Sequence, residues 1–216
     1  AAREVLKFHR DQYDILAVYL PSLIPYTNYT VNTINNGKDD FLLEKYFVSD
    51  DQAKEFCDWL MEVHGAMKKK ELEFKPCIFP WYAASVKKSD LVEKAAVIAA
   101  MIKDQDRIDR LCPHISDCDA FGRDIYFKLL TKGAKTAAVR KAIIDGLEDK
   151  NTSTRWAAFE RAKGMKLRID EYRQIEGMLR LRYEDLRRNA MELLMKQSDE
   201  DLQVTIHRLL SSSKTQ

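Results

Sequence analysis

Apolar residues recur at helical spacing along most of this 216-residue chain. From Ser89 onward, apolar positions three and four residues apart are separated by short polar gaps, a pattern typical of amphipathic helices joined by tight turns. The pattern predicts helices over residues 89–103, 105–112, 118–132, 135–148, 152–164, 169–181, 183–197 and 199–212. Each has one apolar face, so each needs a neighbour to cover it.

The first part of the chain also contains helical patterns. Residues 3–20 have near-helical apolar spacing that ends at Pro21, because proline cannot continue a helix. Ser49 and Gln52 resemble a capping box, in which the two side chains satisfy N–H groups at a helix start. We therefore expect a second helix from this box to about Met67.

A polar segment separates these two patterns. Residues 26–40 are rich in asparagine and include Asn36-Gly37, a pair typical of a tight hairpin turn. The sequence therefore predicts a polar loop over 26–40, closed by a short hairpin. We divide the chain into an N-terminal helical region, residues 1–82, and a repeat region, residues 83–216.

A fixed offset of 32 residues links several positions in the repeat region. Arg123, Arg155 and Arg187 lie 32 residues apart, and each is followed by a small or apolar residue three and seven positions later. Asp117 and Asp149 precede the first two arginines by six residues. Two helices and two turns take about 30–45 residues, so the offset indicates repeated helix pairs.

This pattern resembles the HEAT-like repeat family, in which antiparallel helix pairs stack into an α-solenoid. The resemblance implies an all-α fold with a ladder of hydrogen bonds between repeats, made here by Asp117, Arg123, Asp149, Arg155 and Arg187. It covers residues 115–216 well and 83–114 weakly. In the third copy Leu181 replaces the acidic residue, which leaves Asp185 as an alternative partner for Arg187. Residues 183–212 are also similar to helical-repeat stretches of long bacterial proteins of unknown function.

Composition supports a helical, globular protein. The chain is 45% hydrophobic and 32% charged, with 7 glycines and 5 prolines, fewer turn formers than a β-sandwich uses. No apolar run approaches the roughly 18 residues of a membrane span, so we expect no membrane partner. No secretory signal is present at the start, and four irregularly spaced cysteines are typical of free thiols. We therefore expect a cytoplasmic location.

Basic residues suggest one binding surface. The net charge is +2, but residues 135–216 hold 17 basic and 13 acidic residues, a net of +4. If the predicted helices pack as pairs, four side chains could converge along one edge and bind phosphate. These four are Arg155, Arg161, Lys163 and Arg188. An ordinary charged surface is the alternative.

No catalytic or metal-binding signature is present. Cys112, His114 and Cys118 form the densest group of possible metal ligands, but their spacing matches no common zinc site. We expect free thiols, no bound metal and no cofactor. The four histidines lie in no nucleophile motif, and the glycines do not have phosphate-loop spacing.

Three functions remain open at this point. The first is a module that binds or scaffolds a protein or peptide and is not an enzyme. The second is nucleic-acid binding, including an enzyme of the HEAT-like alkylpurine DNA glycosylase kind. That family uses Trp and Asp in a basic groove, an arrangement that Trp59, Trp81 and Trp156 do not match. The third is a part of a larger protein, favoured by any exposed apolar face at Ala1–Tyr19 or Leu202–Leu210.

Overall fold

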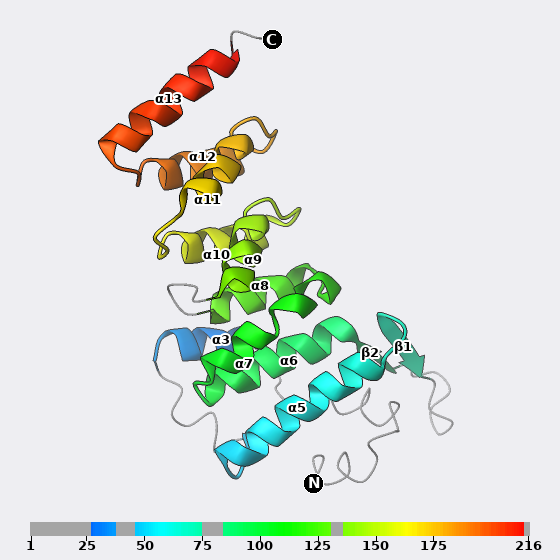
Figure 1. The fold of residues 1–216 in the computed structure, drawn as a ribbon. Helices are drawn as coiled ribbons and strands as arrows, with labels where there is room; N and C mark the ends of the chain where they lie inside the picture. The colour runs from blue at the N-terminus through cyan, green and yellow to red at the C-terminus, as the bar shows by residue number, and fades with distance from the viewer. Residues whose placement is uncertain (1–26, 38–45, 75–83, 131–135, 214–216) are drawn as a thin grey trace. The chain divides into compact units, whose positions relative to one another are not determined.

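The computed structural model describes residues 27–37, 46–74, 84–130 and 136–213. The chain divides into two compact units, Ala1–Leu130 and Thr131–Gln216, each described here by itself. The described residues are mostly helical (Figure 1), as the sequence predicts. The unit boundary lies after Leu130, whereas the sequence pattern placed the start of the repeats at residue 83. The predicted helix over residues 3–20 lies outside the described residues.

Helix α6 (Lys88–Met101) is the centre of the first unit. It is buried from Leu91 to Met101, and its two buried charged residues, Glu93 and Lys94, pair with each other at 3.2 Å. Several elements pack against it: α5 (Asp50–Ala66), α7 (Gln105–Arg110), the 3-10 helix η1 (Cys112–Asp117) and α8 (Ala120–Leu129). Alanines in α6 leave room for this close packing.

Helix α5 begins at the predicted cap. The Ser49 hydroxyl accepts a hydrogen bond from the N–H of Gln52 at 3.3 Å, and the Gln52 side chain accepts from the N–H of Val48 at 2.9 Å. The first bond satisfies an N–H group that the first turn leaves without a helical partner. The second bond fixes the residue that precedes the cap, much as a capping box does. The predicted helix start is therefore confirmed.

The predicted polar loop over 26–40 is wrong, because Thr27–Asn35 form helix α3. Its threonines and asparagines have low intrinsic helix propensity, so packing must stabilise it. Thr27, Thr30 and Val31 are buried, and the Thr27 hydroxyl accepts from the ammonium of Lys94 in α6 at 2.6 Å. Gly37, which we expected in a hairpin turn, instead follows the helix end with a φ of 64°, a conformation that glycine adopts at little cost.

A short two-stranded sheet is a local departure from the all-α prediction. Strands β1 (Glu71–Phe74) and β2 (Ala84–Lys87) pair antiparallel, with Glu71 opposite Lys87. The ammonium of Lys87 lies 3.9 Å from the carboxylate of Glu71. Each strand is four residues long, too short for a period of two to stand out from a helical pattern.

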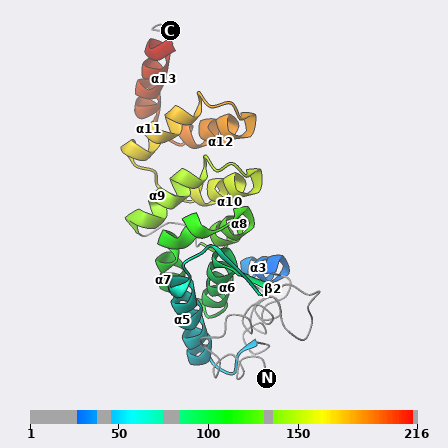
Figure 2. The ribbon, with the colours of Figure 1, turned by 90° about the vertical axis from the view of Figure 1, so that its right-hand side faces the viewer.

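The second unit contains five helices among its described residues. They are α9 (Ala137–Gly146), α10 (Thr152–Ala162), α11 (Ile169–Met178), α12 (Glu184–Leu194) and α13 (Asp199–Ser213). Helix α9 packs on α10, and α11 packs on α12; α9 also contacts α11, and α10 contacts α12. Figure 2 shows these as two successive helical hairpins, with α13 after them. The helix positions agree with those predicted from the sequence.

Polar caps set the helix starts of this unit. The side chains of Thr136 and Asn151 accept from backbone N–H groups three residues later, at 3.2 and 3.1 Å. Ser198 does the same at the start of α13, at 3.2 Å. These caps explain why the sequence locates the turns well. Within the described ranges, none of the helices combines the length and the apolar character that crossing a membrane requires.

Candidate functional site

The three arginines at the 32-residue offset occupy one position in their helices. Each is the fourth residue of α8, α10 or α12. From there the guanidinium donates to backbone carbonyls five or six residues earlier, in the turn before the helix. The acceptors are Cys118 for Arg123, Asp149 and Lys150 for Arg155, and Leu181 and Arg182 for Arg187, at 2.7–3.3 Å. Each arginine therefore closes the turn that precedes its own helix.

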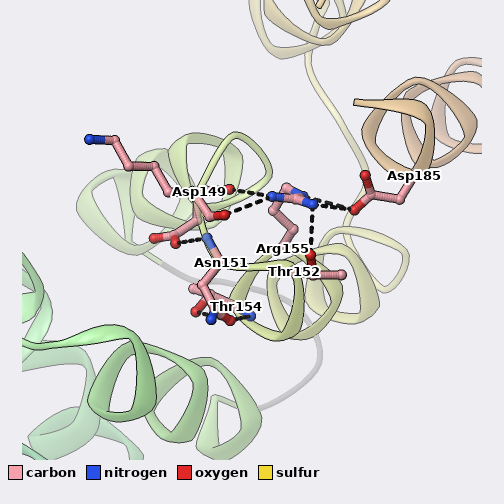
Figure 3. Close-up of polar contacts among 7 residues, drawn as sticks. Asp149, Asn151, Thr152, Thr154, Arg155 and Asp185 are labelled. Carbon is pink, nitrogen blue, oxygen red and sulfur yellow. Dashed lines mark hydrogen bonds and ion pairs between the residues drawn. The ribbon is translucent and has the colours of Figure 1, made fainter. Parts of the chain in front are cut away.

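Arg155 also joins one hairpin to the next. Its Nε and Nη2 groups donate to Oδ2 of Asp185 in α12, at 2.9 and 2.6 Å (Figure 3). Nη2 donates in addition to the hydroxyl of Thr152 at 2.9 Å. Together with the two turn carbonyls, these partners occupy the five N–H groups of a guanidinium. The guanidinium carbon of Arg155 also lies 4.8 Å from the centre of the Tyr183 ring.

The predicted carboxylate partners differ from those in the structure. Arg155 bonds to the backbone carbonyl of Asp149, while the Asp149 carboxylate accepts from the N–H of Asn151 at 2.8 Å. Asp185, which we considered for Arg187, is the carboxylate that pairs with Arg155. The reason is that an aspartate in the turn caps its own loop, whereas the arginine faces the next hairpin.

Asp117 is likewise not a partner of Arg123. Among the described residues its carboxylate pairs with His64, with Oδ2 at 3.2 Å from Nε2. Arg123 keeps its bond to the carbonyl of Cys118. The arginine positions therefore repeat along the chain, and the aspartates before them do not have an equivalent role.

Two further ion pairs link helices of the second unit. Arg140 in α9 donates to both carboxylate oxygens of Glu171 in α11, at 2.8 and 2.5 Å. Arg208 in α13 does the same to Glu176 in α11, at 2.9 and 2.5 Å. Both glutamates are buried. These pairs were not predicted from the sequence. Each joins residues of opposite charge that lie 31 or 32 positions apart, on helix faces that also carry apolar residues.

The four residues predicted to bind phosphate do not form a free basic edge. Arg155 is buried and fully hydrogen-bonded, as described above. Lys163 lies within 3.4 Å of carboxylate oxygens of Glu160 and Glu192. Burial lowers the pKa of Arg161, and Arg188 is exposed on α12. Arg155 is therefore a structural residue and not a phosphate ligand.

The tryptophans considered above lie in different settings. Trp59 is buried in α5, Trp156 is exposed on α10, and Trp81 lies outside the described residues. Trp156 packs against Phe159, with ring centres 5.4 Å apart. Trp156 and Tyr183 are both about half exposed, and aromatic side chains of this kind are common in contacts with other proteins.

A group of metal-capable side chains lies in the first unit. His64 in α5 meets His114 and Asp117 in η1, with one ligand atom of each within 4.8 Å of the others. His64 is buried, and its ring centre lies 4.6 Å from that of His114. Burial, His114 and Lys88 lower the pKa of His64, while Asp117 opposes this shift. Two imidazoles and a carboxylate could hold zinc with a water as fourth ligand.

Cys112 and Cys118, which lie close to His114 in the sequence, are not members of the group formed by His64, His114 and Asp117. Cys118 donates from its Sγ to the carbonyl of His114 at 3.7 Å, and burial raises the pKa of its thiol to about 12. His64 was missed because it lies 50 residues before His114 in the chain, and only the packing of α5 near η1 brings them together.

A small cavity lies next to this group. Its volume is about 190 Å³, and its lining includes Cys57, Asp58, Arg107 and His114. Burial raises the pKa of the Cys57 thiol to about 11, so the sulfur is protonated at neutral pH. Because the thiolate is the nucleophile, this cysteine is not activated for covalent chemistry.

The fold and these contacts define a mostly helical protein whose C-terminal unit contains two helical hairpins in contact, linked by ion pairs such as Arg155–Asp185. The chain matches the model of a family described as a family of unknown function, DUF5724, over residues 2–216, and it belongs to that family. No curated protein and no solved structure matches it.

Proposed function

We propose that this chain is a HEAT-like α-solenoid module that binds or scaffolds a protein or peptide partner. The observation that carries the proposal is that the same turn-closing contact recurs in successive hairpins. An arginine at the fourth position of the second helix closes its turn in both hairpins of the C-terminal unit. Stacks of this kind present extended surfaces that many partners use.

The ion pairs support a rigid stack rather than a loose bundle. Arg140–Glu171, Arg155–Asp185 and Glu176–Arg208 each bridge successive layers. Buried ion pairs add little net stability, but they can specify one register over others. A fixed register keeps exposed side chains at constant spacing, which is what a binding surface needs.

Exposed aromatic residues give the best-supported contact for a partner. Trp156 and Tyr183 are each about half exposed in the C-terminal unit. Tryptophan and tyrosine are enriched among the residues that dominate binding energy at protein interfaces. We therefore place Trp156 at the centre of the proposed contact. Nucleic-acid binding has less support, because Arg155 and Lys163 are paired internally with acidic residues.

A cytoplasmic location is part of this proposal. The thiols of Cys57 and Cys118 are free and buried among the described residues, as suits a reducing compartment.

Selection from a random peptide library tests the proposal. The full chain should enrich a peptide family, and the Trp156→Ser variant should lose it, while Tyr29→Ser, an exposed aromatic residue of the other unit, should retain it. Fluorescence anisotropy with duplex DNA and single-stranded RNA at low salt, where phosphate contacts are strongest, should show no saturable binding. Nucleic-acid binding abolished by Arg188→Ala, with no peptide enriched, would defeat the proposal.

A further inference from the structure

One face of helix α10 makes the contacts to the next hairpin. Arg155, Phe159 and Lys163 lie four residues apart, so they share one stripe of the helix. Arg155 pairs with Asp185 and Lys163 pairs with Glu192, both in α12. Phe159 lies between them and is 1% exposed. This stripe is therefore the surface on which α12 packs.

The equivalent stripe on α12 is uncovered. Its members, 32 residues further on, are Arg187, Met191 and Met195. Met191 is 53% exposed and Met195 is 69% exposed. Phe159 in α10 and Met191 in α12 thus occupy the same position, and both are apolar. Phe159, on the helix that a further hairpin follows, is buried, and Met191 is not.

Arg187 makes the hydrogen bonds within its own turn but not the bonds to a following hairpin that Arg155 makes. Its Nη1 closes the turn by donating to the carbonyls of Leu181 and Arg182, as Arg155 does in its own turn. In Arg155 the Nε and Nη2 groups bond to a carboxylate of the next hairpin. For Arg187, no carboxylate in the described parts of the chain takes that place. The Nε and Nη2 groups of Arg187 are therefore placed to bind a carboxylate that the described residues do not supply.

The helix pairing indicates what fits here. In the two hairpins, α9 packs with α10 and α11 packs with α12, and each second helix also contacts the second helix of its neighbour. Helix α13 is a first helix, and the described residues contain no second helix that packs with it (Figure 2). A single helix placed against α12 and α13 would repeat the contacts that α12 makes with α10 and α11.

We propose that Arg187, Met191 and Met195 form a docking face for one amphipathic helix of a partner protein. This helix carries Asp or Glu in its first turn, where Asp185 stands in α12, and an apolar stripe after it. The carboxylate binds Nε and Nη2 of Arg187, and the apolar residues cover the two methionines. This inference rests on the proposed function, and it specifies a partner chemistry and a surface separate from Trp156.

The test supplies such a helix by tethering. A copy of residues 183–197, with its own two methionines replaced by leucine so that only Met191 and Met195 of the chain are detected, is joined to the C-terminus of the full chain. The flexible Gly/Ser linker gives a local concentration in the millimolar range. Oxidation of each methionine by hydrogen peroxide is followed by mass spectrometry. We expect Met191 and Met195 to oxidise roughly fivefold more slowly than in the chain alone, because the helix buries them. Met178, which is already buried, is the internal reference and should not change.

The control fusion carries Asp185→Lys in the tethered copy only. It keeps the apolar stripe but places a cation against Arg187, so most of the protection should be lost. Equal protection by both fusions, or no protection by either, overturns the proposal. So does protection of Met191 and Met195 in the unmodified chain as its concentration rises, with dimers in sedimentation, because the occupant is then a second copy. Peptide selection through Trp156 is scored separately, so failure of this face and failure of the proposed function are distinguishable.

Discussion

Replacing Arg155 with methionine should destabilise the C-terminal unit more than any comparable change at its repeat equivalent. Methionine keeps most of the length of the side chain but removes every N–H group of the guanidinium. The change abolishes bonds to two turn carbonyls, to Thr152 and to Asp185. It also leaves the Asp185 carboxylate without its cation.

The size of the effect follows from the burial of the two partners. Removing one member of a buried ion pair costs about 3–5 kcal/mol. The side chain of Arg155 is 3% exposed and that of Asp185 is 29% exposed, so water can solvate the orphaned carboxylate in part. We therefore expect about 3 kcal/mol, at the lower end of that range.

Arg187→Met is the matched control, because it changes the same helical position. Arg187 is half-buried and bonds to two carbonyls of its own turn, with no carboxylate from another described helix. Its loss should cost about 1 kcal/mol. The difference between the two variants isolates the contact between hairpins.

Native-state hydrogen exchange with mass spectrometry measures both costs locally. The free energy of opening is read for amides in α10 and α12 of each variant, and this avoids treating the two units as one transition. A double variant, Arg155→Met with Asp185→Leu, should recover part of the loss, since no charge is then left unpaired. Equal costs for Arg155→Met and Arg187→Met would refute the reasoning.

Three further predictions concern other groups. Burial and the neighbouring His114 lower the pKa of His64 below its ordinary 6.5. The unfolded chain therefore binds this proton first as pH falls, and stability that is fully present above pH 6.5 should be lost as pH falls below it, through the lower pKa of the folded state. Thermal melts should show a smaller loss for His64→Gln, and equal slopes would contradict this. The Cys57 thiol, with its pKa raised to about 11, should react with iodoacetamide at pH 8 roughly 100-fold more slowly than an exposed cysteine. Mass spectrometry of the alkylated peptide measures the rate. A rate matching that of a free peptide would refute the prediction. Arg208→Gln leaves buried Glu176 without its cation and should lower the local opening free energy of α13 by about 1 kcal/mol; unchanged exchange in α13 would argue against this anchor.

The sequence predicted the C-terminal helices well because their signals are local. Caps such as Thr136 and Asn151 and the regular apolar spacing lie within single helices and turns. Local signals of this kind can be derived from one sequence. The equivalence of the three arginine positions followed from the 32-residue offset, but their role did not. The sequence analysis expected a ladder with Asp117 and Asp149, whereas each arginine bonds to carbonyls of the turn before its own helix.

Contacts between distant segments were not predictable in the same way. Asp185 lies 30 residues after Arg155, two short of the repeat offset, so spacing alone did not identify it as the partner. Helix α3 was predicted as a loop, since its helical state depends on packing and on the bond from Lys94 to Thr27 rather than on propensity. The group of His64, His114 and Asp117 forms only once α5 lies beside η1.

A disulfide between α9 and α11 tests the stacking of the two hairpins most directly. Asp145 and Gln174 lie on these helices, and the Gln174 amide donates to the Asp145 carboxylate at 3.2 Å. With both replaced by cysteine, mild oxidation followed by trypsin should yield one linked species that joins peptides 142–150 and 174–180. Recovery of both peptides unlinked, with their new cysteines free to alkylate, would contradict the stacked arrangement.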